Sequence, residues 1–190
     1  MKIIFLDIDG VLNSRVDMLN GVHLNNHKVL LLRSLLDMDK DVKIVISSAW
    51  RILNDHEQIA MQLYRCGLGV RHSRVIGSTD NGYVEEGSVD NRHGLNQQRG
   101  LQIDRWLKNH PEVTEYVILD DSIDMTDYQL SNRFIRIDAE TGLTECYCAR
   151  AAVMLGLIED SDDYWNCREY LTDINQIKNR NQLRREYYES

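Results

Sequence analysis

The sequence predicts an α/β fold: a doubly wound, mainly parallel, Rossmann-like sheet with helices on both faces. Short apolar, β-branched runs alternate along the chain with segments whose apolar positions recur at helical spacing, as in strands joined by crossover helices. Several of these runs end directly in acidic or hydroxyl residues, and the carboxyl ends of parallel strands meet at one edge of such a sheet. The chain has 190 residues, 43% of them hydrophobic, which is enough for one domain with a sizeable core.

The first predicted strand, residues 3–6, ends in Asp7-Ile8-Asp9-Gly10. A strand end would hold both carboxylates on a rigid element and aim them into the crevice where α/β sheets bind ligands. Two like charges do not suit a hydrophobic core, because burying them without a counter-ion costs several kcal/mol. The pair therefore indicates a site for a divalent cation and an electrophile, although calcium-binding loops also use short acidic patterns of this kind.

A short polar connection, residues 14–24, leads to a helix that should cover the sheet. Asn25 or Asn26 can cap this helix, and apolar positions follow at helical spacing to about residue 38. We expect no inserted domain in the connection, because it is too short to hold one.

The second predicted strand, residues 42–46, ends in Ser47 and Ser48. A hydroxyl directly after a buried strand can donate a hydrogen bond to a phosphoryl oxygen, and adjacent main-chain N–H groups can help. The alternative is that the two serines only cap the next helix. Arg51 could clamp a phosphate or a ribose edge with two hydrogen bonds, or it could be a surface ion-pair partner.

A helix over residues 55–66, with a stop at Gly67, and a short strand at residues 75–76 come next. Residues 77–98 then hold four glycines and almost no large apolar side chains. A loop this long in a compact domain is either disordered or functional. If it is functional, Arg92 and His93 are its candidate substrate contacts; the alternative is that both are solvated loop residues.

A helix is predicted to begin at Arg99, and a strand at residues 116–119 ends in Asp120-Asp121. A cation at a helix start opposes the macrodipole, which favours a functional role for Arg99. The acidic pair again needs a cation, and carboxylates without His or Cys suit Mg²⁺ better than zinc. A last strand, residues 134–137, and an Ala-rich helix to about residue 157 complete the predicted domain.

The net charge of −8 is concentrated in residues 106–160, which hold 11 acidic and 4 basic residues. A protein that grips long duplexes by their phosphates should show a basic face, and the sequence shows none. We therefore expect no binding of long duplex DNA. No run of eighteen apolar residues and no signal peptide is evident, so we expect a cytoplasmic protein that does not enter membranes.

Four of these features, in the same order, resemble the motifs of the haloacid-dehalogenase-like (HAD) phosphatases. They are the DxDG sequence, a Ser after the second strand, a basic residue at a helix start and an acidic pair after a later strand. The match is narrower still in four segments: SSxWR, RGxxIxxWL, LDDSxDM and TGLT. These are similar to the HAD phosphatase domain of Swiss Army Knife RNA repair proteins, over about residues 1–157.

The resemblance implies a Mg²⁺-dependent phosphatase with the HAD fold, capless or with a reduced lid. The loop at residues 77–98 falls where many HAD enzymes carry a cap, so it would be that lid. Asp7 would attack phosphorus and form an aspartyl-phosphate, and Asp9 would protonate the leaving oxygen and then deprotonate the water. Ser47 and Arg99 would orient and neutralise the phosphoryl group. Further substrate contacts would come from Gly10, Ser48, Arg51 and Arg92. The metal would be held by Asp7, the main-chain carbonyl of Asp9, and Asp120 or Asp121.

The expected substrate is a nucleic-acid end phosphate or a nucleotide. Alternatives are a small-metabolite phosphatase or nucleotidase and, in another class, a non-catalytic binding module with the same fold. Residues 158–190 should form a separate helical extension packed on the domain or on a partner. Their interleaved basic and aromatic residues could also hold single-stranded nucleic acid. The sequence leaves the oligomeric state open.

Overall fold

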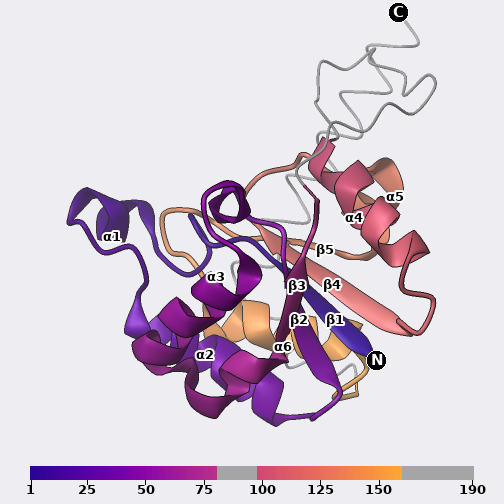
Figure 1. Cartoon of the computed structure of the whole chain (residues 1–190), viewed down its shortest axis with the longest axis horizontal. Helices are drawn as coiled ribbons and strands as arrows, with labels where there is room; N and C mark the ends of the chain where they lie inside the picture. The colour runs from indigo at the N-terminus through magenta and orange to yellow at the C-terminus, as the bar shows by residue number, and fades with distance from the viewer. Residues whose placement is uncertain (81–97, 160–190) are drawn as a thin grey trace, which may run out of the picture.

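The computed structural model describes residues 1–80 and 98–159, which form a five-stranded sheet with every neighbouring pair of strands parallel (Figure 1). The strand order is β3-β2-β1-β4-β5. The strands are β1 (Lys2–Leu6), β2 (Val42–Ile46), β3 (Val75–Ser78), β4 (Glu115–Asp120) and β5 (Phe134–Arg136). The chain moves outward from β1 through β2 to β3, then returns to the other side of β1 for β4 and β5. The order therefore reverses between β1 and β4, which is where doubly wound sheets open a ligand crevice.

Helices cover both faces of the sheet (Figure 1). One face packs against α2 (Asn26–Asp37), α3 (His56–Leu63) and α6 (Glu145–Met154), and the other against α4 (Gln98–Lys108) and α5 (Asp127–Asn132). Strand residues alternate between the two cores: Ile4 and Leu6 face the α2 side, whereas Ile3 and Phe5 face the α4 side. The predicted α/β class and parallel sheet are confirmed.

The predicted helix after residue 25 is also confirmed, since Asn25 caps α2 by accepting a hydrogen bond from the His27 main-chain N–H (3.0 Å). Two short helices were not predicted. The first, α1 (Arg15–Leu19), lies in the segment expected to be a plain connection, and the second is α5. Neither carries an apolar stripe: α1 buries no residue, and α5 fully buries only Gln129.

The helix predicted over residues 55–66 ends earlier than expected. Asp55 caps α3, which ends at Leu63. The chain then widens into a π-helical turn, η2 (Tyr64–Leu68), and continues as the tighter 3-10 helix η3 (Gly69–Arg74). Gly67, the predicted stop, lies inside η2 with a φ of 117°, a conformation that side chains other than glycine rarely adopt.

The predicted lid at residues 77–98 is too long at both ends, since β3 continues to Ser78 and α4 begins at Gln98. Two predicted segments lie outside the described residues: residues 81–97 of the lid, with Arg92 and His93, and almost all of the C-terminal extension at residues 158–190. Both stay predictions. Within residues 1–80 and 98–159, no helix has the length and apolar character needed to span a membrane.

Candidate active site

Four strand ends place polar residues in one row along the carboxyl edge of the sheet. Main-chain hydrogen bonds between neighbouring strands continue one residue past the strand ends. The N–H of Asp7 donates to the carbonyl of Leu119 (3.0 Å) and the N–H of Ser47 to the carbonyl of Leu6 (3.0 Å). The N–H of Thr79 donates to the carbonyl of Ile46 (2.9 Å). The row therefore reads Thr79, Ser47, Asp7 and Asp120. Since neighbouring strands lie about 4.8 Å apart, adjacent members can contact one small ligand together.

The row faces the helix layer formed by α4 and α5. Phe5, Val45 and Ile118, each two residues before a member of the row, belong to the core on that side. Alternation along a strand then gives Asp7, Ser47 and Asp120 the same orientation. Thr79 has the same orientation, because Gly77, two residues before it, faces α4: a Cβ at Gly77 would lie 3.9 Å from Nε1 of Trp106.

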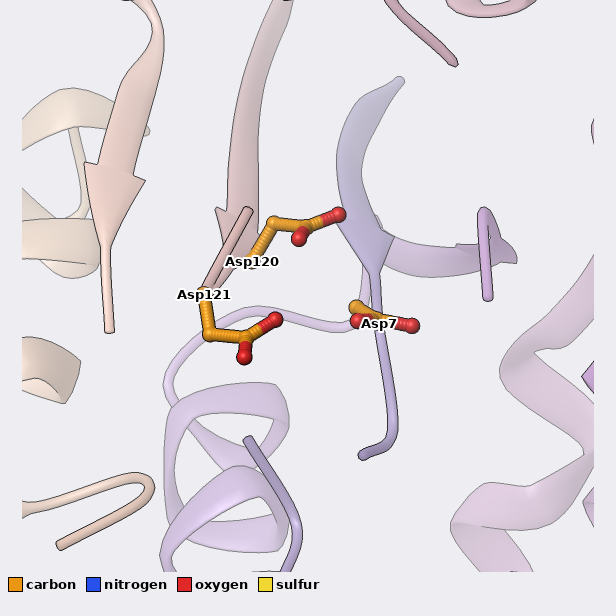
Figure 2. A group of neighbouring side chains, drawn as sticks. All are labelled: Asp7, Asp120 and Asp121. Atoms are coloured by element: carbon orange, nitrogen blue, oxygen red, sulfur yellow. The ribbon is translucent and has the colours of Figure 1, made fainter. Parts of the chain in front are cut away.

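Three carboxylates meet at the point where the strand order reverses. Asp7, at the end of β1, and Asp120 and Asp121, at the end of β4, have oxygen atoms within 4.8 Å of one another (Figure 2). Asp7 is 5% exposed and Asp120 is fully buried. Burial, followed by the charge of Asp7, raises the pKa of both Asp120 and Asp121. An all-oxygen site whose carboxylates repel one another fits a hard divalent cation such as Mg²⁺.

Arg99, in the first turn of α4, supplies positive charge to this cluster. Its Nη1 lies 3.2 Å from Oδ2 of Asp7 and also donates to Asp120. Burial alone would lower the pKa of Arg99, but the carboxylates of Asp120 and Asp7 outweigh it and raise the pKa, so the guanidinium stays charged. A cation at a helix N-terminus is unfavourable, and Asp124 compensates for it by capping the first turn. Its carboxylate accepts a hydrogen bond from the main-chain N–H of Arg99 (3.3 Å), and its main-chain carbonyl accepts one from the N–H of Gly100 (2.9 Å).

The two serines after β2 have different environments. Ser48 caps the 3-10 helix η1 (Ala49–Ile52), with its Oγ accepting from the Trp50 N–H (3.3 Å). Ser47 is fully buried, and its Oγ has no hydrogen-bond partner among the residues that the structure describes. The capping alternative therefore describes Ser48. An unpaired buried hydroxyl beside Asp7 is what a phosphoryl oxygen would satisfy, so the predicted role of Ser47 keeps its support.

Arg51 bonds to protein groups around the row. Its Nη1 donates to the carbonyls of Ser47 (2.6 Å) and Ser48 (2.5 Å), and its Nη2 donates to Oε1 of Gln102 on α4 (2.6 Å). Burial, and then the charge of Arg99, lowers the pKa of Arg51. These contacts tie the end of β2 to α4 and support a positioning role; the predicted clamp on substrate stays a prediction.

The loop after β1 turns tightly behind the cluster at Gly10. This residue has a φ of 79°, and a Cβ here would lie 2.6 Å from Oδ2 of Asp121. Its N–H donates to Oδ1 of Asn13 (2.8 Å). Gly10 is therefore needed for the approach of the two loops, while its predicted contact with substrate stays untested.

The side chain of Asp9 does not join the carboxylate cluster. Its exposed carboxylate is not among the three that cluster, and it accepts hydrogen bonds from Asn13 and Trp50 (2.9 Å each). The predicted roles of Asp9, with its main-chain carbonyl on the metal and its side chain in proton transfer, stay predictions.

Sequence reasoning missed three residues of this site: Thr79, Trp50 and Asn13. Thr79 is 2% exposed and, as at Ser47, its hydroxyl oxygen has no hydrogen-bond partner within residues 1–80 and 98–159. The available signal is the same as at Ser47, a hydroxyl directly after a strand. The strand predicted at residues 75–76 is two residues shorter than β3, which leaves Thr79 in the predicted loop. Trp50 and Asn13 were missed because they matter through their contacts with Asp9, and contacts between loops leave no local pattern in the sequence.

Comparison with known proteins gives one match. A family model described as the HAD domain in Swiss Army Knife RNA repair proteins matches residues 3–147. No curated protein and no solved structure matches the chain. Apart from Lys2 at the start of β1, the matched span contains the five strands of the described residues. It also contains the carboxylate cluster with Arg99 and Ser47.

Proposed function

The chain belongs to the family of HAD domains in Swiss Army Knife RNA repair proteins, and from this premise we propose that it is a Mg²⁺-dependent phosphomonoester hydrolase that works through an aspartyl-phosphate. The observation that carries the proposal is the polar row. It sets the buried carboxylate of Asp7 between the unpaired hydroxyl of Ser47 and the acidic end of β4, with Arg99 bonded to Asp7 and Asp120.

In the first half-reaction, a carboxylate oxygen of Asp7 attacks phosphorus in line and the ester oxygen leaves. Asp9, held outside the carboxylate cluster, gives the departing oxygen a proton. In the second half-reaction, Asp9 takes a proton from water, the water oxygen attacks phosphorus, and the carboxylate of Asp7 is regenerated with release of phosphate.

Ser47 and Arg99 act on the phosphoryl group itself. The Ser47 hydroxyl donates to one phosphoryl oxygen, and Arg99 reduces the repulsion between that group and the Asp7 carboxylate. Mg²⁺, held by Asp7, the main-chain carbonyl of Asp9 and Asp120 or Asp121, would stabilise negative charge on the phosphoryl group when bound.

Phosphate release from a panel of monoesters tests this proposal. We expect turnover that requires Mg²⁺ in the wild-type protein and a loss of more than about 10³-fold in Asp7→Asn, because an amide cannot form the acyl-phosphate. Circular dichroism and urea unfolding check that the variant is folded. Turnover of Asp7→Asn at a rate near that of wild type would contradict the mechanism, and no turnover of any ester would favour the non-catalytic module.

We propose nucleic-acid end phosphates or nucleotides as the substrate class, and the RNA repair context of the family supports this choice. The net charge of −8 favours the alternative, a nucleotidase or small-metabolite phosphatase. A strand end needs contacts to flanking phosphates, and each contact adds a slope of about −0.7 to the dependence of log affinity on log salt concentration.

The two substrate classes are separated by measuring kcat/KM for a 3′- or 5′-phosphorylated oligonucleotide and for a mononucleotide over a range of salt concentrations. A preference for the oligonucleotide that fades with salt supports nucleic-acid ends. A preference for the mononucleotide at low salt supports the nucleotidase. An oligonucleotide with hydroxyl ends, added as a competitor, controls for binding away from the phosphate pocket.

A further inference from the structure

We propose that Trp50 is a positioning residue for the carboxylate of Asp9, acting together with Asn13. The inference rests on the proposed function, in which Asp9 exchanges protons with the leaving group and with water. It concerns one hydrogen bond, from Nε1 of Trp50 to Oδ2 of Asp9 (2.9 Å).

Both oxygens of Asp9 are held by neutral donors. Oδ2 accepts from the Trp50 indole and Oδ1 from the Nδ2 of Asn13 (2.9 Å). The Asp9 residue is exposed, so without these bonds its side chain would be free to change rotamer. Proton transfer requires the acid to lie within hydrogen-bond reach of the leaving oxygen, and a misplacement of about 1 Å can cost about 100-fold in rate.

Asn13 has a fixed orientation. It is fully buried, its Oδ1 accepts from the Gly10 N–H (2.8 Å), and its Nδ2 donates to the His23 carbonyl (2.8 Å) as well as to Asp9. Because one end of the amide meets a donor and the other end meets acceptors, a flipped amide would lose these bonds.

Trp50 is fixed by the element that carries it. It lies in η1, whose first turn is capped by Ser48, and its ring packs against the core on the α2 side of the sheet. The indole has a single N–H and no acceptor, so it can contribute only one directed bond to the site. The bond links the segment after β2 to the loop after β1.

Trp50→Phe removes the N–H and keeps most of the aromatic ring, which makes it a cleaner probe than a change at Asn13. For an alkyl ester such as a nucleoside monophosphate, we expect kcat to fall by about 10- to 100-fold with KM within about twofold. For an aryl phosphate, whose leaving group needs little protonation, we expect a fall of no more than a few-fold.

Trp106→Phe is the matched control. The Trp106 ring packs edge-on against Phe5 and stacks on His110, on the opposite face of the sheet from Trp50. It should not change the ratio of alkyl to aryl rates. A structural role for Trp50 would lower both rates alike, and that outcome would overturn the proposal.

A double-mutant cycle with Asp9→Asn completes the test. Once the carboxylate is gone, Trp50→Phe should cause no further loss of kcat for the alkyl ester; an undiminished loss would show that Trp50 acts elsewhere. If Asp9→Asn itself has no leaving-group dependence, the acid role in the proposed function is wrong and this inference is wrong with it. If Asp9→Asn shows that dependence and Trp50→Phe does not, only the inference fails.

Discussion

Ser47 and Thr79 each bury a hydroxyl oxygen that has no hydrogen-bond partner in the described part of the chain. Leaving such a group unpaired costs about 1–3 kcal/mol. Such an unpaired hydroxyl is expected at a binding site, where a bound ligand provides the missing hydrogen-bond partner. These two side chains, in one row with Asp7, are therefore the clearest signs that the edge of the sheet is built for binding.

Ser47→Ala should separate stability from activity. Removing the unpaired hydroxyl should leave the free energy of unfolding unchanged or raise it by up to about 1 kcal/mol, whereas kcat/KM should fall by about 10²- to 10³-fold. Urea unfolding and steady-state kinetics measure the two effects.

Ser48→Ala is the comparison, because it removes the cap of η1 and should cost about 1 kcal/mol of stability. A large loss of stability in Ser47→Ala would mean that its hydroxyl has a structural partner.

Gly10→Ala should weaken both the fold and the metal site. The new methyl group would combine strain at a positive φ with a clash against the Asp121 carboxylate. Gly21→Ala is the control, since Gly21 has a similar φ of 74° and an added Cβ would meet nothing within 4 Å.

We expect Gly21→Ala to cost about 1 kcal/mol in urea unfolding and Gly10→Ala clearly more. Only Gly10→Ala should raise the Mg²⁺ concentration needed for half-maximal activity. Equal effects of the two changes would mean that Asp121 does not need the close approach.

At the scale of elements, the position of Arg99 depends on how α4 meets the segment before α5. A Cβ at Gly100 would lie 2.5 Å from Oε1 of Gln129, 2.6 Å from the Thr126 nitrogen and 2.8 Å from the Met125 Cα. The Nε2 of Gln129 donates to the Gly100 carbonyl (2.9 Å) and so joins α5 to the first turn of α4. This contact fixes the first turn of α4. Arg99, in that turn, forms ion pairs with both Asp7 and Asp120.

Gly100→Ala should destabilise the protein although alanine is the better helix former. The gain in helix propensity is about 1 kcal/mol, but the main-chain atoms that the methyl group would meet cannot move without shifting α4. We expect a net loss of about 1–3 kcal/mol in urea unfolding and reduced kcat, because Arg99 moves with the helix. A stabilised and fully active variant would contradict this view of the packing.

The strands were predictable because each contains a short apolar run, and the bounds of β2 were predicted without error. The end of β3 was missed because its last two residues are Gly77 and Ser78. The helices α1 and α5 were missed because amphipathic periodicity was the signal used, and neither buries an apolar stripe. Both carry capping boxes, Ser14 with Asp17 and Thr126 with Gln129, which were the available local signal.

The convergence of Asp7 and Asp120 was predictable because parallel strands end at one edge. Arg99 lies at a helix start, and its place beside them was predicted from the resemblance to the HAD motifs. The bond between Trp50 and Asp9 was not, because it depends on how η1 lies over the loop after β1.

At the scale of the whole molecule, the excess negative charge is partly concentrated at one point. Asp7, Asp120 and Asp121 meet between β1 and β4, and burial raises the pKa of Asp120 and Asp121. A cation bound there would relieve repulsion in the folded chain, so metal binding and stability should be linked.

Chelation should stop turnover, and added Mg²⁺ should restore it and raise the melting temperature. At a free concentration of 100 times Kd, a ligand specific for the folded state adds about 2.7 kcal/mol. Differential scanning fluorimetry over a Mg²⁺ series measures the effect. Asp121→Ala should weaken it more than Asp124→Ala, since Asp124 lies outside the cluster. Full activity in excess chelator would overturn the metal assignment.

The central position of β1 has a consequence for the order of folding. Leu6 pairs with Ile46 on one side and with Leu119 on the other, so the second partner strand follows 113 residues later. At about 5–20 residues per second, a ribosome needs on the order of 10 s between Asp7 and Asp120. During that interval one edge of β1 has no strand beside it, and an open edge is prone to aggregation. Asp7 is thus synthesised early but acquires its surroundings late. In refolding experiments, the proposed phosphatase activity should return only with the slowest phase, which joins β4 to β1.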